Sequence, residues 1–183
     1  MRITPEGTSE DGQDGELAPE PVRELALVPM EGLNHADITL VHREALRVLR
    51  PGIDTAHLDA YSDDAWPPEA LPSYERLLTL DREAAPTDGS PSRRRDPGMA
   101  IDIDVRDDEQ FELLVTLAPY TIGAEAAQGD RPVFSANDSG TSLWLAVTRE
   151  QEAQLQRRLR ELGIPEAALT DAPRRRPSWW HRR

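Results

Sequence analysis

The chain has 183 residues, with 34 acidic residues against 21 basic ones and a formal net charge of −13. It contains no cysteine, which excludes disulfides and thiol catalysis. No apolar run approaches the roughly 20 residues of a bilayer-spanning helix, and the first residues lack the apolar core of a secretory signal, so we expect a cytoplasmic protein. All 21 basic residues are arginine, which indicates a GC-rich bacterial genome.

The distribution of the large aliphatic residues and phenylalanine along the sequence divides the chain into five segments. They are sparse in 1–24 and absent from 85–98 and 170–183. We therefore predict a disordered acidic N-terminus at 1–24, a flexible linker at 85–98 and a basic tail at 170–183. Ordered structure is expected at 25–84 and 99–169.

The segment 25–84 predicts a helical unit. Asn34 suits the N-cap of a helix, apolar residues follow it at helical spacing, and Pro51 with Gly52 ends the pattern. A second helix is predicted from Ser73 to about Ala84. Whether these helices form a unit of their own or pack on a neighbouring sheet stays open at this point.

The segment 99–169 predicts a strand, a helix, three strands and a helix, in that order. In its first strand, at 101–105, isoleucine and valine alternate with aspartate, as in a strand with one exposed face. Thr148 and Gln151 form a capping box that opens the last helix. The remaining strands are predicted at 120–126, 132–136 and 141–148. This order predicts an α+β fold: a small antiparallel-rich sheet with two helices on one face, preceded by the helical N-terminal unit.

Three of the four histidines, His35, His42 and His57, lie close together in the sequence with acidic residues near them. Imidazole and carboxylate groups are zinc and manganese ligands, so these residues are the candidates for a metal site. The spacing lacks the tight pattern of a known zinc motif, and a helix that packs on a core also explains His42. We therefore predict no metal and no other cofactor.

Asp102 and Asp104 flank Ile103, a spacing also found in acid pairs that hold a divalent cation. The alternation with apolar residues already explains both as the outer face of a strand. We predict that they contribute to an acidic contact surface. No glycine-rich phosphate loop and no nucleophile motif supports catalysis.

The tail combines a net charge of +4 with two adjacent tryptophans, on a chain that is otherwise acidic. Tryptophan and arginine are the residue types that most often anchor protein interfaces. The tail is expected to contact either a partner or the acidic surface of the chain itself. The predicted contact residues of the tail are Arg174, Arg175, Arg176, Trp179, Trp180, Arg182 and Arg183.

These features together predict a non-catalytic protein-binding module, an adaptor or a regulator, with an acidic body and a basic aromatic tail. The partner is expected to be another protein, of basic character, because an acidic body repels phosphate backbones and anionic membranes. Peripheral membrane contact through the tail is an alternative, although an anionic membrane would repel the acidic body. Two alternative functions stay open: an immunity- or antitoxin-like inhibitor of a basic partner, and a small metal-dependent hydrolase that uses the three histidines.

Overall fold

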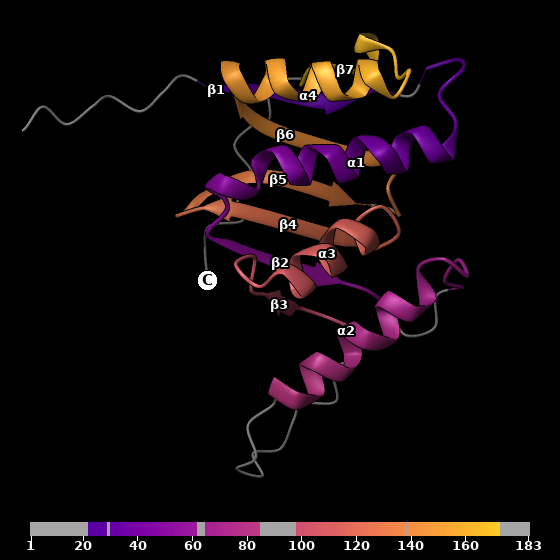
Figure 1. The fold of residues 1–183 in the computed structure, drawn as a ribbon, viewed down its shortest axis with the longest axis vertical. Helices are drawn as coiled ribbons and strands as arrows, with labels where there is room; N and C mark the ends of the chain where they lie inside the picture. Colours follow the sequence, from indigo (N-terminus) through magenta and orange to yellow (C-terminus); the bar gives the residue numbers. More distant parts are fainter. Residues whose placement is uncertain (1–21, 29, 62–64, 85–97, 138, 173–183) are drawn as a thin grey trace, which may run out of the picture.

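The computed structural model describes residues 22–28, 30–61, 65–84, 98–137 and 139–172. Strands and helices alternate along these residues except for three consecutive strands near the middle of the order (Figure 1). The strands are β1 (Val22–Leu27), β2 (Thr55–Asp59), β3 (Ile101–Ile103), β4 (Gly123–Gln128), β5 (Arg131–Asn137), β6 (Ser142–Thr148) and β7 (Leu169–Asp171). The α-helices are α1 (His35–Leu49), α2 (Leu71–Ala84), α3 (Asp108–Leu117) and α4 (Arg149–Glu161), with short 3₁₀ turns at Arg50–Gly52 and Glu166–Ala168.

The strands form one sheet of seven in the order β3-β2-β4-β5-β6-β1-β7, and each neighbouring pair is antiparallel. Both edge strands, β3 and β7, have only three residues. Helices α1, α3 and α4 lie on one face of this sheet, and α2 packs on α3 beyond them (Figure 1). The predicted α+β class is confirmed, and the sheet is larger than expected.

The helix-covered face holds the core. One row of paired residues crosses six of the seven strands on this face, and all of its members are buried. Its members are Ile103, Ala56, Ala126, Phe134, Leu145 and Leu25. Burial of this apolar row against the helices supplies the main driving force for the fold.

The predicted starts of the first and last helices are confirmed, whereas the second helix begins at Leu71 and not at the predicted Ser73. Asn34 caps α1 and forms a capping box with Asp37, and Thr148 does the same for α4 with Gln151. Each cap pairs backbone N–H groups that the first turn of a helix leaves without partners. Gly163 follows α4 with a φ of +78°, the left-handed conformation that ends many helices.

The structure corrects the prediction for 25–84. This segment contributes β1 and β2 to the sheet as well as α1 and α2, so it is not a purely helical unit. The same finding moves two boundaries: β1 begins at Val22, inside the predicted N-terminus, and β7 ends at Asp171, inside the predicted tail. These strands are short, and pairing with distant strands stabilises them, so the local sequence carries little signal.

Candidate functional site

The face of the sheet opposite α1, α3 and α4 carries a row of side chains that differs sharply from the core row. We call this surface the open face. The strand register places one residue of each strand side by side across the whole sheet. From β3 to β7 they are Asp102, His57, Glu125, Ser135, Trp144, Ala26 and Thr170.

One end of the open face is acidic. His57 lies in register with Asp102 on one side and Glu125 on the other, and its Nε2 is 3.7 Å from Glu125 Oε2. The side chains of His57 and Glu125 are 42% and 54% exposed. Asp59 lies two residues further along β2, where its Oδ1 accepts a hydrogen bond from the Ala100 N–H at 2.6 Å. One histidine and three acidic residues, Asp102, Glu125 and Asp59, therefore lie at this end of the sheet.

The other end of the open face is aromatic. Trp144 is partly exposed on β6, and its indole Nε1 donates a hydrogen bond of 3.3 Å to Glu24 Oε2 on β1. Between the two ends, Asn137 Nδ2 donates to Ser135 Oγ at 3.2 Å. A flat aromatic surface beside carboxylates suits a cationic side chain, which can stack on the indole and pair with the acid.

The two predicted acidic contact residues have different positions. Asp102 is exposed within the row of the open face. Asp104 lies after β3, where its Oδ1 accepts a hydrogen bond from the Arg106 N–H at 3.0 Å, while its own N–H donates to Gln110 Oε1. Asp104 therefore shapes the turn into α3. The tail residues from Arg174 to Arg183 lie outside the described residues.

The structure does not bring the three candidate metal ligands together. His42 is a buried residue of α1, and its ring lies edge-on to Phe134 of the core row, whereas His57 lies on the open face. His35 lies at the start of α1 beside the ring of Tyr120, 5.8 Å between centroids. Within the described ranges, no three histidine or acidic side chains cluster closely enough to hold a metal ion.

The open face also lacks the geometry of a nucleophile with its base. Ser135 and His57 share the row but are separated by β4. Neighbouring strands are about 4.8 Å apart, so these two side chains start roughly 10 Å from each other. Proton transfer needs a hydrogen bond of about 3 Å. Asn137 already donates a hydrogen bond to Ser135 Oγ.

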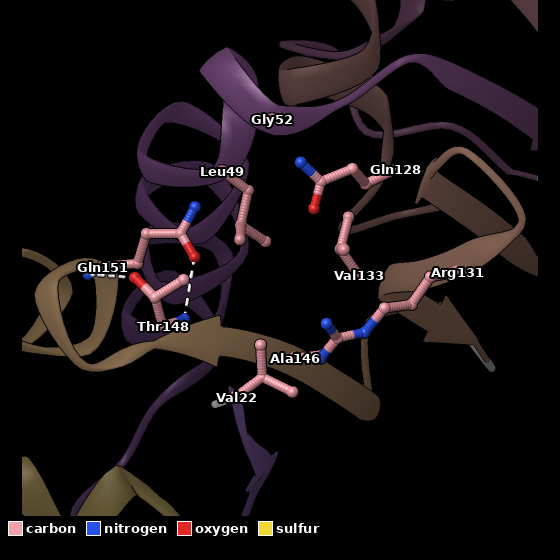
Figure 2. Close-up of a pocket in the computed structure, with 9 residues that line it drawn as sticks. All are labelled: Val22, Leu49, Gly52, Gln128, Arg131, Val133, Ala146, Thr148 and Gln151. Atoms are coloured by element: carbon pink, nitrogen blue, oxygen red, sulfur yellow. Dashed lines mark hydrogen bonds between the residues drawn. The ribbon is translucent and has the colours of Figure 1, made fainter. Parts of the chain in front are cut away.

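A small pocket opens at the end of the sheet where β5 and β6 separate (Figure 2). The ladder between them runs from Phe134–Leu145 to Asn137–Ser142, although β5 begins at Arg131 and β6 continues to Thr148. These ends still pair with β4 and β1 but not with each other, and a cavity of about 80 Å³ lies between them. Sequence patterns could not reveal it, because it depends on where two strands stop pairing.

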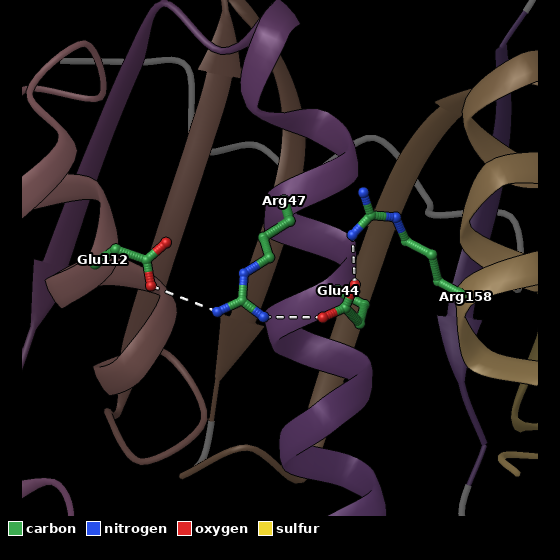
Figure 3. A network of polar contacts seen from close by, with 4 residues as sticks. All are labelled: Glu44, Arg47, Glu112 and Arg158. Atoms are coloured by element: carbon green, nitrogen blue, oxygen red, sulfur yellow. Dashed lines mark hydrogen bonds and ion pairs between the residues drawn. The ribbon is translucent and has the colours of Figure 1, made fainter. Parts of the chain in front are cut away.

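An ion-pair network lies on the opposite side of the molecule from the open face (Figure 3). Glu44 of α1 is buried and accepts hydrogen bonds from Arg47 at 2.9 Å and from Arg158 of α4 at 2.8 Å. Arg47 also pairs with Glu112 of α3 at 3.4 Å. Burial by itself raises the pKa of Glu44, but the bonds from Arg158 and Arg47 outweigh it and hold this pKa below its ordinary value. This network joins three helices and has a structural role.

No described helix is both long and apolar enough to cross a membrane. Comparison with known proteins finds no matching family model, no matching curated protein and no matching solved structure.

Proposed function

We propose that this chain is a non-catalytic protein-binding module, an adaptor or regulator, that binds a basic partner protein on its open face. The observation that carries the proposal is the row of polar and aromatic side chains across the sheet, with carboxylates at Asp102 and Glu125 and an indole at Trp144. The strand register aligns these groups on a single face, which the four described helices leave uncovered.

The charge of this surface supports a basic partner over other classes. No arginine stands in the row, and Asp59 and Glu24 add two further carboxylates beside it. Arginine side chains of a partner would pair with the carboxylates and stack on Trp144. A nucleic acid or an anionic membrane would meet repulsion here.

The tail remains part of the proposal as a second contact surface, through its tryptophans and arginines. An immunity- or antitoxin-like inhibitor is the special case in which the acidic open face covers the basic active site of a toxin. Both versions require carboxylates on the open face.

The proposal is tested by capturing partners from a lysate of the source organism with four forms of the chain. These are the full chain, the double variant Asp102→Asn/Glu125→Gln, the matched variant Glu150→Gln/Glu161→Gln on exposed positions of α4, and a version that ends at Ala172. Each double variant removes two negative charges, so only the position of the charges differs.

We expect a basic partner that the full chain and the α4 variant recover equally and that the open-face variant recovers at least tenfold less, since charged pairs at an interface contribute to both affinity and association rate. Loss of the partner on truncation after Ala172 would show that the tail takes part. Equal recovery by both double variants would overturn the open face as the contact surface.

A further inference from the structure

The pocket between β5 and β6 includes none of the seven residues in the row across the open face and has a chemistry of its own. Its walls come from the diverging strands, with Val133 on β5 and Ala146 on β6. Its roof comes from the end of α1 and the start of α4, with Leu49 and Gln151. Elements from both halves of the chain therefore form the pocket.

Among the residues that the structure describes, Arg131 is the only charged one that lines this pocket, and no acidic residue of these ranges lines it. Figure 2 shows its guanidinium directed from β5 into the space beside Ala146. Among the described residues, no ion pair or hydrogen bond holds the Arg131 guanidinium. On a chain of net charge −13, a pocket lined by one cation and no anion stands out as a local positive site.

Two amide nitrogens converge on the roof of the pocket. The point that a Cβ on Gly52 would occupy lies 3.6 Å from Gln128 Nε2 and 4.0 Å from Gln151 Nε2. The orientation of Gln151 is fixed, because its Oε1 accepts a hydrogen bond of 2.9 Å from the Thr148 N–H. Its amide N–H groups therefore remain available as donors to a ligand.

We propose that this pocket binds a small carboxylate, with the carboxylate group on Arg131 and the two glutamine amides and a short alkyl group against Leu49 and Val133. A planar guanidinium matches a carboxylate in a two-bonded geometry. A tetrahedral phosphate has more oxygens to satisfy, and beyond Arg131 and the two amides only the Thr148 hydroxyl among the described lining residues could donate to them. The cavity of about 80 Å³ limits the ligand to a few heavy atoms, since a water molecule takes about 30 Å³.

Propionate is the probe that tests this site. The ¹⁵N-labelled full chain is titrated with sodium propionate at constant ionic strength, and the backbone amide shifts are followed by NMR. We expect saturable shifts at Gln128, Arg131 and Gln151. Propionamide, the neutral analogue, should give no saturable shift, because it cannot form the ion pair with the guanidinium.

Three variants make the test specific. Arg131→Gln should weaken propionate binding at least tenfold, whereas Arg82→Gln, on an exposed position of α2, should leave it unchanged. Gly52→Ala adds a methyl group at ordinary contact distance from both amides, so it should fold normally and also weaken binding. If Arg131→Gln fails to fold, Gly52→Ala alone tests whether propionate binds in this pocket.

Shifts that grow linearly without saturation would overturn the site. Unchanged affinity in Arg131→Gln and in Gly52→Ala would do the same. Tighter binding of inorganic phosphate than of propionate would overturn the assignment of a carboxylate. Loss of partner capture by the open-face variant bears only on the proposed function, so the two proposals fail independently.

Discussion

His42 is a titratable residue buried in the core. Its Nδ1 lies 2.8 Å from the Ile38 carbonyl oxygen, so Nδ1 carries the proton and donates it, and Nε2 is buried with no hydrogen-bond partner. The pKa of His42 is lowered to about 4: burial is the main cause, the bond to the Ile38 carbonyl opposes it in part, and the charge of His35 adds a smaller lowering. The folded chain therefore holds this ring neutral.

This depressed pKa predicts an acid-dependent loss of stability. The unfolded chain binds a proton at His42 below about pH 6.5, whereas the folded chain binds one only near pH 4. The contribution of this residue to the free energy of unfolding is therefore complete above pH 6.5 and falls as the pH drops toward 4, by roughly 3 kcal/mol.

The replacement His42→Leu should flatten the profile of unfolding free energy between pH 6.5 and 4, measured by urea denaturation. Ala153→Ser, on an exposed position of α4, provides the control, because it changes no titratable group and should leave the slope close to that of the original chain. An unchanged slope in His42→Leu would show that other groups cause the acid sensitivity.

At the scale of the element, Glu44 links α1 to α4 by accepting a hydrogen bond from Arg158, and it also accepts one from Arg47 on its own helix. Replacement of Glu44 by alanine removes one acceptor from each guanidinium group, but each arginine side chain is 38% exposed and can turn to water, and Arg47 keeps its pair with Glu112. We expect Glu44→Ala to lower the free energy of unfolding by about 1–2 kcal/mol.

The matched control is Glu166→Ala, which removes the exposed pair with Arg160. Exposed pairs contribute little, so this change should cost less than about 0.5 kcal/mol. Chemical denaturation measures both values. Equal costs would contradict the structural role of the buried network.

Replacement of two glycines in hairpin turns would separate the free-energy cost of a left-handed backbone from that of a steric clash. Gly129 and Gly140 both have positive φ, +54° and +81°. A Cβ on Gly129 would meet nothing within 4 Å, whereas a Cβ on Gly140 would lie 2.2 Å from the Pro119 carbonyl oxygen.

Gly129→Ala should therefore cost about 1–2 kcal/mol from the left-handed backbone alone. Gly140→Ala should cost clearly more, because the turn must also move away from Pro119. Thermal unfolding followed by circular dichroism ranks the two variants. A smaller loss in Gly140→Ala than in Gly129→Ala would contradict the packing of the turn on Pro119.

The helices and the central hairpins could be predicted from local sequence because their signals are local. Caps at Asn34 and Thr148 fix where α1 and α4 begin, and the alternation in 142–148 identifies β6. β2 has five residues and β7 has three, too short for a clear period. Distant partners stabilise both, and no local pattern encodes such pairing.

The same reason limits prediction of the candidate site. The alternation around Asp102 correctly predicted an exposed acidic position. The alignment of Asp102 with His57 and Glu125 depends on the order β3-β2-β4, which joins strands far apart in the sequence. The sequence gives no sign that Arg131 lines a pocket, because this position depends on where β5 and β6 stop pairing with each other.

At the scale of the whole molecule, the sheet interleaves the two halves of the chain. β2 lies between β3 and β4, and β1 lies between β6 and β7. The segment 99–172 alone would leave β3 and β7 without their neighbours and would lose α1 from the core. We expect the fragment 99–172 to show no cooperative thermal transition, whereas the full chain unfolds in one step.

Differential scanning calorimetry measures both, and addition of a separate peptide of residues 22–84 should restore a transition if the two halves fold only together. A cooperative transition in the fragment alone would show that 99–169 is a separable module after all.

The three-residue edge strands also affect how readily the protein can associate with itself through its sheet. An exposed long edge offers unpaired N–H and C=O groups on which another sheet can grow. β3 and β7 present few such groups, and an exposed Asp102 at the centre of β3 places a charge on one of the edges. The longer central strands are thereby flanked by edges that offer little backbone for fibrous self-association, on a chain whose described helices leave one face of the sheet uncovered.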